Sequence, residues 1–149
     1  MPETEAEHTF EVDLQWRGGR LGTGSLRGAG LQTGVSVPAA IGGPGSGSNP
    51  EELLAGAAAV CYAITLAALL ERMRLPLAAD ITLHSQLSVE AGPPLRVVRV
   101  VHRPTIRLAP GADVERARRA AVQAEEYCLV SKALRGNVEL LVEPEILVG

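Results

Sequence analysis

The sequence predicts an α+β fold, in which an antiparallel sheet carries its helices on one face. A long apolar segment, residues 48–76, has the composition and the end signals of a single helix. The segments on either side of it alternate apolar and polar residues, a pattern typical of half-buried strands. Because strands and helices do not alternate strictly along the chain, a parallel sheet of βαβ units is not expected. We expect a single domain over residues 1–149 with the element order β-β-β-α-β-β-α-β.

The first three strands are expected between residues 8 and 37. Residues 1–7 are predicted to be a frayed tail, and residues 8–16 alternate in the manner of a half-buried strand. The apolar face of this strand comprises Phe10, Val12, Leu14 and Trp16. A Gly- and Arg-rich turn follows, which predicts a hairpin with a second strand over 21–26 and a short third strand over 32–37.

The helix over residues 48–76 is the centre of the predicted fold. Asn49 suits the N-cap position and Pro50 the first helical position. Glu51 and Glu52 follow in the first turn, where carboxylates suit the helix dipole. The helix is apolar nearly all round, which predicts that it is buried in the core of a domain or of a dimer. Charged residues near both of its ends make a membrane span the poorer interpretation.

The C-terminal half is expected to complete the sheet and to add a second helix. Residues 81–89 and 95–108 are two alternating segments around a Gly-Pro-Pro turn, as in a pair of antiparallel strands. A helix over 113–128 follows, with small apolar residues at helical spacing. A short helical piece over 129–136 and one last strand over 137–149 close the chain.

Composition argues against several classes of function. A net charge of −3 without a basic run or an aromatic platform does not indicate nucleic acid as the partner. The N-terminal segment is acidic and unlike a signal peptide, and two cysteines do not make a secreted disulfide framework, so the cytoplasm is expected. His8, His84 and His102 have no metal-ligand spacing, so no metal is assigned. The Gly-rich loop at 42–48 lacks the lysine of a phosphate-binding loop.

Cys61, near the middle of the central helix, and Cys128, at the end of the next helix, are the candidate reactive groups. A free cysteine in an apolar helix is often an inert buried side chain, and that interpretation stays open. A reactive thiol must ionise, and the dipole of its own helix acts only within the first and last turns. A cation from another segment, held by a carboxylate, is therefore expected beside Cys61. The candidates are Arg17, Arg20, Arg27, Glu51 and Glu52.

Two stretches, NPEELLAGAAAVC at 49–61 and EYCLVSKAL at 126–134, resemble the paired signatures of the OsmC/Ohr family. This family comprises the osmotically inducible and the organic hydroperoxide resistance proteins. With both cysteines and the element order, the resemblance covers roughly residues 8–147. It implies an OsmC-like fold, an intertwined homodimer with the central helices packed inside, and a metal-free, cysteine-based peroxidase.

The resemblance also implies roles for individual residues. Cys61 corresponds to the peroxidatic cysteine and Cys128 to the resolving cysteine of the family. The glutamate at the start of the family's helix corresponds to Glu51, and its N-terminal arginine to Arg20, with Arg17 as the alternative. The Cys61 thiolate would attack an organic hydroperoxide and become a sulfenic acid, and Cys128 would condense with it to a disulfide. An external dithiol, such as a lipoyl-type reductant, would reset the pair without a bound cofactor.

Three positions depart from the family's pattern. Ala58 stands where the OsmC branch often has His, Leu129 stands where Pro is frequent, and Tyr62 stands where Phe is usual. The branch and the preferred peroxide therefore stay open. A second hypothesis is an OsmC-fold protein that binds a small ligand or senses redox state without peroxidase turnover. A third is a purely structural role for both thiols.

Helix geometry constrains how Glu51 can serve Cys61. Ten residues of α-helix span about 15 Å, so the two residues of one unbroken helix cannot share a site directly. Three solutions stay open: Arg20 bridges the distance, the helix begins after Glu51, or Glu51 comes from a partner subunit. We favour the partner subunit, because an antiparallel two-fold crossing brings each helix start near the middle of the other helix.

Overall fold

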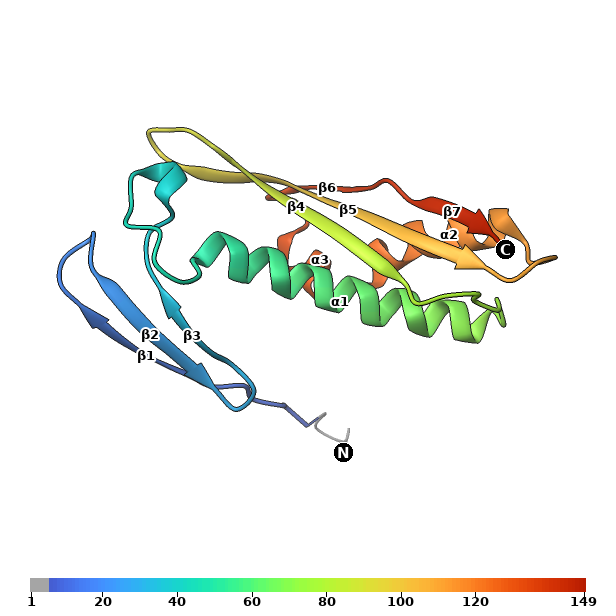
Figure 1. Ribbon diagram of the computed structural model, residues 1–149, viewed down its shortest axis with the longest axis horizontal. Coiled ribbons are helices and arrows are strands. Elements are labelled where there is room, and N and C mark those ends of the chain that lie inside the picture. The colour runs from blue at the N-terminus through green and yellow to red at the C-terminus, as the bar shows by residue number, and fades with distance from the viewer. Residues whose placement is uncertain (1–5) are drawn as a thin grey trace, which may run out of the picture. The chain divides into compact units, whose positions relative to one another are not determined.

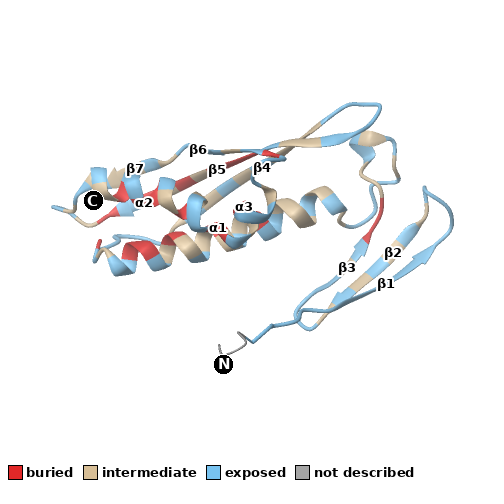
Figure 2. Ribbon diagram, turned by 180° about the vertical axis from the view of Figure 1, so that it is seen from behind, coloured by how far each residue is buried: buried red, intermediate tan, exposed pale blue. Residues whose placement is uncertain are grey.

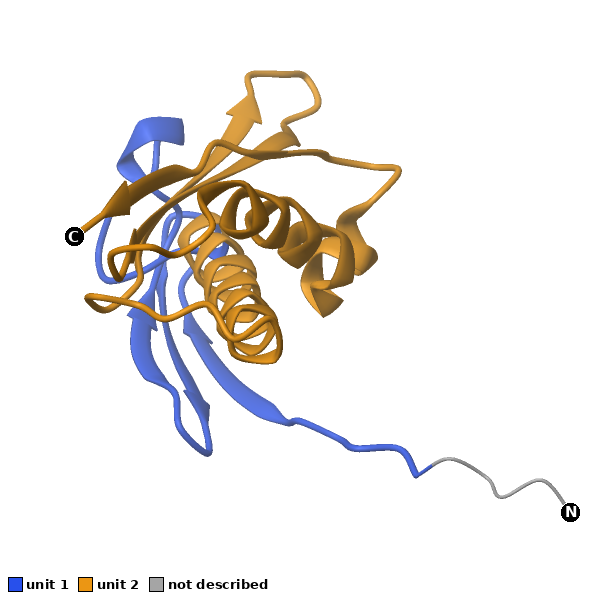
Figure 3. Ribbon diagram, turned by 90° about the vertical axis from the view of Figure 1, so that its right-hand side faces the viewer, with its two compact units in different colours: residues 1–50 blue, residues 51–149 orange. Residues whose placement is uncertain are grey.

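The computed structural model describes residues 6–149, so most of the tail predicted over residues 1–7 lies outside the described residues. Seven strands, one 3₁₀ turn and three α-helices follow one another along the described chain (Figure 1). The chain separates into two compact units, residues 1–50 and residues 51–149, and each unit has its own sheet (Figure 3).

The first unit is a three-stranded antiparallel sheet in the order β1-β2-β3. Its strands are β1 Val12–Arg17, β2 Thr23–Gly28 and β3 Gln32–Val35, followed by the 3₁₀ turn η1 Ala39–Ile41. The predicted hairpin and third strand are therefore confirmed. The Gly/Ser-rich loop is tied back to β3, because the Ser36 hydroxyl accepts a hydrogen bond from the Ser46 N–H at 2.8 Å and Ser48 N–H donates to the Gly34 carbonyl at 2.8 Å.

The apolar face of β1 was predicted to be half-buried, and this prediction is wrong for the chain by itself. The exposed fractions are 94% for Phe10, 61% for Val12, 56% for Leu14 and 42% for Trp16. Figure 2 shows β1 in the pale blue of exposed residues. Leu26 of β2 and Val35 of β3 lie on the same face of the sheet, and Leu26 is half-buried while Val35 is buried. The exposed part of this face is therefore its β1 edge.

The second unit combines the long helix with a four-stranded sheet and two further helices. The helices are α1 Pro50–Arg72, α2 Val114–Tyr127 and α3 Leu129–Leu134. The strands are β4 Thr82–Glu90, β5 Arg96–Leu108, β6 Glu139–Val142 and β7 Glu145–Val148. The ends of α1 agree with the sequence signals to within a few residues. Helix α2 begins where predicted, because the Asp113 carboxylate accepts the N–H groups of Glu115 and Arg116 at 3.0 and 3.2 Å.

The sheet of this unit is mixed, whereas an antiparallel sheet was predicted. Strands β4 and β5 are antiparallel, but β6 and β7 both pair with β5 in parallel. The chain passes from β5 through α2 and α3 before it returns, and such a crossover gives a parallel strand. The single last strand is interrupted at Pro144, which has no N–H to donate. Its register nevertheless continues, because Val142 pairs with His102 and Glu145 with Thr105.

The core of the second unit lies between the sheet and the helices, which cover one face of the sheet (Figures 1 and 3). Tyr62, Leu66 and Leu70 of α1 pack there with Ile106 of β5 and with the small side chains of α2. Helix α1 is long and apolar enough to cross a membrane by length and composition, but this buried face identifies it as a core helix.

The prediction that α1 is buried all round is only half right. Val60 is 61% exposed and Ile64 is 66% exposed, on the side away from the core of the unit. The reason is that the sheet and α2 of the same unit supply one packing surface, and a helix has two sides. An apolar stripe of α1 therefore stays uncovered in the described chain.

Candidate functional site: two thiols at the start of α3

The structure brings Cys61 and Cys128 together within the second unit. Cys61 lies in α1 and is half-buried, whereas Cys128 lies between α2 and α3 and is fully buried. Both are free cysteines, and each thiol is among the causes of the other's pKa shift. Thiols 67 residues apart in the sequence thus form one dithiol pair, as the resemblance implied for residues of these two stretches.

Cys128 is the single residue that joins two helices. Its extended backbone, φ −63° and ψ 126°, ends α2 and starts α3. The first N–H groups of a helix have no partner inside the helix. In α3, the N–H groups of Leu129 and Val130 face the Cys61 sulfur, and the N–H of Ser131 faces the Cys128 sulfur. The start of α3 is therefore a donor set for both thiols.

The pKa of the Cys61 thiol is lowered from its ordinary value. Burial acts in the opposite direction and raises the pKa of Cys61, because it disfavours the charged form. Hydrogen bonds that favour the thiolate outweigh burial. They come, in decreasing order of effect, from the Val130 N–H, the Cys128 thiol and the Leu129 N–H. Thr65 has the smallest effect, and its hydroxyl donates to the Cys61 carbonyl at 2.8 Å.

The pKa of the Cys128 thiol is raised, and burial is the largest cause. The neighbouring Cys61 raises the pKa of Cys128 further, while the N–H and the otherwise unpartnered hydroxyl of Ser131 lower it. The two thiols therefore differ: Cys61 is partly accessible and has a lowered pKa, and Cys128 is enclosed and has a raised pKa. This asymmetry suits a nucleophile beside a second thiol that reacts later.

The sequence reasoning missed these donors. It required a cation beside Cys61 because it considered only the helix that contains Cys61. The backbone N–H groups of Leu129 and Val130 come from a different, short helix, and neutral donors in this position already lower the pKa of Cys61. A sequence signal existed, since the helical piece predicted after Cys128 had to begin with unpaired N–H groups next to a cysteine.

A second missed feature is a buried aromatic pair that includes Tyr62, the residue after Cys61. The rings of Tyr62 and His102 are stacked, with centroids 4.5 Å apart and planes inclined by 18°. The Tyr62 hydroxyl donates to the Ala121 carbonyl at 2.8 Å, and the Nδ1 atom of His102 lies 2.6 Å from the Ser85 hydroxyl. Burial lowers the pKa of His102, while the nearby Glu125 carboxylate opposes this change. The pair links α1 to α2 and to β5 at the residue that follows Cys61.

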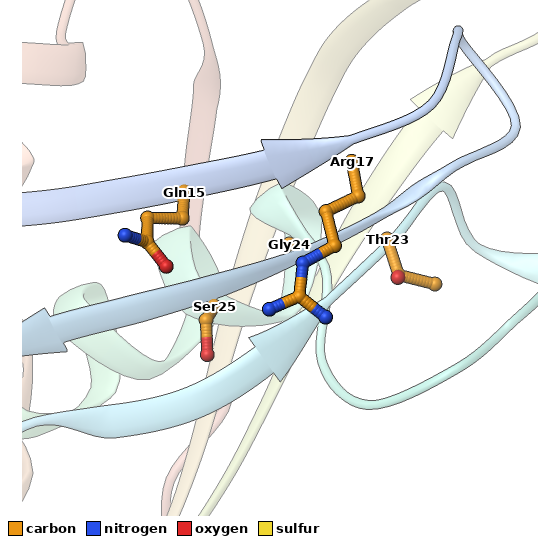
Figure 4. Close-up of a pocket in the computed structure, with 5 residues that line it drawn as sticks. All are labelled: Gln15, Arg17, Thr23, Gly24 and Ser25. Atoms are coloured by element: carbon orange, nitrogen blue, oxygen red, sulfur yellow. The ribbon is translucent and has the colours of Figure 1, made fainter.

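The candidate arginines belong to the first unit. Arg20 lies exposed in the turn between β1 and β2, and Arg17 ends β1. The Arg17 side chain lines a small polar pocket with Gln15, Thr23 and Ser25 (Figure 4). This pocket lies on the face of the hairpin opposite to Leu14 and Trp16. Whether Arg20 or Arg17 approaches Cys61 stays a prediction.

Glu51 lies in the first turn of α1, which runs unbroken from Pro50 to Arg72. The proposal that the helix begins after Glu51 is therefore wrong, and the separation of about 15 Å from Cys61 along the helix stands. The Oε2 atom of Glu51 is buried and has no hydrogen-bond partner among the residues that the structure describes. A buried carboxylate oxygen of this kind requires a donor.

Within residues 6–149, no group of three or more His, Cys, Asp or Glu side chains is arranged to hold a metal ion. In the second unit, the candidate reactive groups are the thiols of Cys61 and Cys128.

Comparison with known proteins places this site in a family context. The family model described as OsmC-like protein matches residues 43–143, which include both cysteines. An uncharacterized protein of Bacillus subtilis, YmaD, is 38% identical over 149 residues, which is 97% of this chain and 98% of that protein. An organic hydroperoxide resistance protein of Xanthomonas axonopodis pv. citri is 28% identical over 83% of this chain and 85% of its own length.

Solved structures of similar proteins agree with the fold. An organic hydroperoxide resistance protein OsmC from Legionella pneumophila superimposes with a TM-score of 0.76 and 26% identity, over 95% of this chain and 99% of that chain. The organic hydroperoxide resistance protein OhrB of Bacillus subtilis gives a TM-score of 0.68 and 26% identity, over 91% of this chain and 98% of that chain.

Proposed function

The chain belongs to the family of OsmC-like proteins, and on that premise we propose that it is a cysteine-based peroxidase that reduces organic hydroperoxides to alcohols. The observation that carries the proposal is a pair of neighbouring thiols in unlike surroundings. The accessible Cys61 has a lowered pKa, and the buried Cys128 beside it has a raised pKa. Relatives named organic hydroperoxide resistance proteins support the choice of substrate class.

In the proposed reaction, the Cys61 thiolate attacks the terminal oxygen of the hydroperoxide. The O–O bond breaks, the alcohol leaves with a proton, and Cys61 becomes a sulfenic acid. The Cys128 thiol then attacks the Cys61 sulfur, water leaves, and a disulfide joins the two residues. An external dithiol of the lipoyl type or another kind is oxidised as it reduces this disulfide, and no bound cofactor takes part.

The surroundings of the thiols favour an organic substrate over hydrogen peroxide. Val60, which precedes Cys61, is 61% exposed, and Leu129, which follows Cys128, is 75% exposed. Apolar side chains beside an accessible thiol can bind the hydrocarbon part of a hydroperoxide, which hydrogen peroxide lacks.

Arg20, with Arg17 as the alternative, is proposed to stabilise the Cys61 thiolate and the departing oxygen. Glu51 is proposed to hold that guanidinium, and the buried, unpartnered Oε2 of Glu51 supports this role. Because Glu51 and Cys61 lie on one unbroken helix, we propose that Glu51 serves the site of a partner subunit in a homodimer. The uncovered apolar faces of β1 and α1 support such an assembly, and the cytoplasm is the proposed compartment.

The test is consumption of tert-butyl or cumene hydroperoxide in the presence of a dithiol. Turnover by the wild-type chain is expected to disappear in Cys61→Ser. Cys128→Ser is expected to reduce one equivalent of peroxide, to form a sulfenic acid that dimedone traps, and to form no internal disulfide. Equal, slow consumption by wild type and Cys61→Ser would refute the peroxidase and leave ligand binding or redox sensing as the function.

A further inference from the structure

One arginine of the second unit, Arg135, lies at the end of α3 and contacts the end of α2. Arg135, the residue that caps the end of α3, turns its guanidinium back to the end of α2. It donates to the Glu126 carbonyl at 3.3 Å and to the Glu125 carbonyl at 3.1 Å. The same group forms an ion pair with the Glu125 carboxylate at 2.6 Å, and the Glu125 side chain is only 14% exposed.

The backbone groups at the joint between α2 and α3 divide into two sets. Helix α2 ends in carbonyls that have no partner inside the helix, and two of them accept from Arg135. Helix α3 begins with N–H groups that have no partner inside the helix, and those of Leu129 and Val130 donate to the Cys61 sulfur. Cys128 is the one residue between the two sets.

We propose that Arg135 is a positioning residue of the dithiol site, whose guanidinium fixes the angle between α2 and α3 and so keeps the first N–H groups of α3 on the Cys61 sulfur. A planar guanidinium holds two carbonyls and a carboxylate in one fixed geometry, whereas the three donors of an ammonium group rotate on a flexible stem. The guanidinium therefore binds the end of α2. The backbone N–H of Arg135 donates to the Ser131 carbonyl at 2.9 Å, which connects the same residue to α3.

The effect of Arg135 on Cys61 is indirect. The groups that act on the Cys61 thiol in the described chain are Thr65, Cys128 and the N–H groups of Leu129 and Val130, of which Cys128 alone is titratable. The charge of Arg135 is paired with Glu125, so its contribution is geometric. Without these contacts of the Arg135 guanidinium, the short helix α3 can shift, and its N–H groups lose their alignment with the thiolate.

The experiment measures the rate at which iodoacetamide alkylates Cys61 across a range of pH, with mass spectrometry to assign the site. Arg135→Ala is expected to alkylate about tenfold more slowly at neutral pH, as the loss of one hydrogen bond to a charged group implies. The midpoint of its pH profile is expected to move upward, and the plateau rate at high pH to stay near that of wild type. Arg135→Lys, which keeps the charge but loses the planar fork, is expected to lie between Arg135→Ala and wild type.

The matched control is Arg118→Ala, which removes an exposed arginine of α2 that pairs with Glu115 at 3.7 Å. Its profile is expected to match wild type. A wild-type profile in a folded Arg135→Ala would overturn the inference. If Arg135→Ala does not fold, a wild-type profile in Arg135→Lys overturns it equally, because the fork is then dispensable.

This inference rests on the proposed function only in that Cys61 acts as a thiolate. Alkylation needs no peroxide, so the two proposals fail separately. A shifted alkylation profile in Arg135→Ala, in a protein without peroxidase activity, would support the positioning role of Arg135 and refute the proposed peroxidase function. An active peroxidase whose Arg135→Ala variant keeps the wild-type profile would do the reverse.

Discussion

The two compact units differ in how they treat their apolar side chains. In residues 51–149, large side chains such as Tyr62, Leu66 and Ile106 are fully buried between helices and sheet. In the described part of residues 1–50, Val35 is the one buried apolar side chain, while Leu14 and Trp16 are 56% and 42% exposed. The second unit closes its own core, and the first unit does not.

This difference indicates where stability and where assembly reside. The first unit exposes an apolar strip on β1, formed by Val12, Leu14 and Trp16. Its apolar strip is the kind of surface that marks an interaction site. The dithiol pair lies wholly in the self-sufficient unit, whereas the candidate arginines Arg17 and Arg20 lie in the other. Folding of the dithiol pair is therefore expected to depend on the second unit, and the proposed completion of its site on the first unit and on assembly.

The largest effect is expected from a core substitution in the second unit. Leu66→Ala removes a fully buried side chain and leaves a cavity, so it should lower the free energy of unfolding by about 2–5 kcal/mol. Leu14→Ala, the same change on the exposed strip, should cost less than about 0.5 kcal/mol when the protein is dilute enough to be monomeric. Urea denaturation of both variants measures the contrast, and equal losses in dilute solution would show that the first unit has a core of its own.

A smaller effect, of a different kind, is expected from a charge on the exposed strip. In the proposed homodimer, Leu14→Asp would place a carboxylate in an apolar interface, so the dissociation constant should rise at least about tenfold. Sedimentation velocity at several protein concentrations measures it. Gln15→Asp is the matched control, because it adds the same charge to the opposite, polar face of β1. If both variants associate like wild type, the strip is not the interface.

The parts of the fold that follow from local chemistry were predictable. Pro50 at the start and the charged residues at the end delimit α1 to within a few residues. Alternation in residues 81–89 and 95–108 identified the antiparallel pair β4 and β5. Cys61 and Cys128 were candidates from the residues alone, and the resemblance of two short stretches implied their separate roles.

The parts that depend on where distant segments meet were not predictable. The parallel pairing of β6 with β5 follows from the crossover through α2 and α3. The alternation of apolar and polar residues in a strand does not show whether the strand pairs in parallel or antiparallel. The exposure of Leu14 depends on what covers the strip, not on the alternation that produced it. The donors for Cys61 are backbone groups of Leu129 and Val130, and every residue except proline carries such a group.

The smallest effect is expected on how the free energy of unfolding depends on pH, through the buried His102 of the second unit. Burial lowers the pKa of His102 in the folded chain, so on acidification the unfolded chain takes up this proton first, near pH 6.5. The free energy of unfolding should therefore fall below that pH, by at most about 1.4 kcal/mol per pH unit for one proton. His102→Phe keeps a ring on Tyr62 but cannot titrate, so between pH 6.5 and about pH 5 its curve should be flatter than that of wild type.

The control for this comparison is His84→Phe, one residue before Ser85 on β4, because His84 is exposed. Its pH dependence should equal that of wild type. Tyr62, Ser85 and Glu125 face or influence the His102 ring, and Glu125 alone opposes the effect of burial on its pKa. If His102→Phe loses stability on acidification as steeply as wild type, the acid-sensitive group lies elsewhere. The buried His102 ring then does not make the second unit more sensitive to acid than the first.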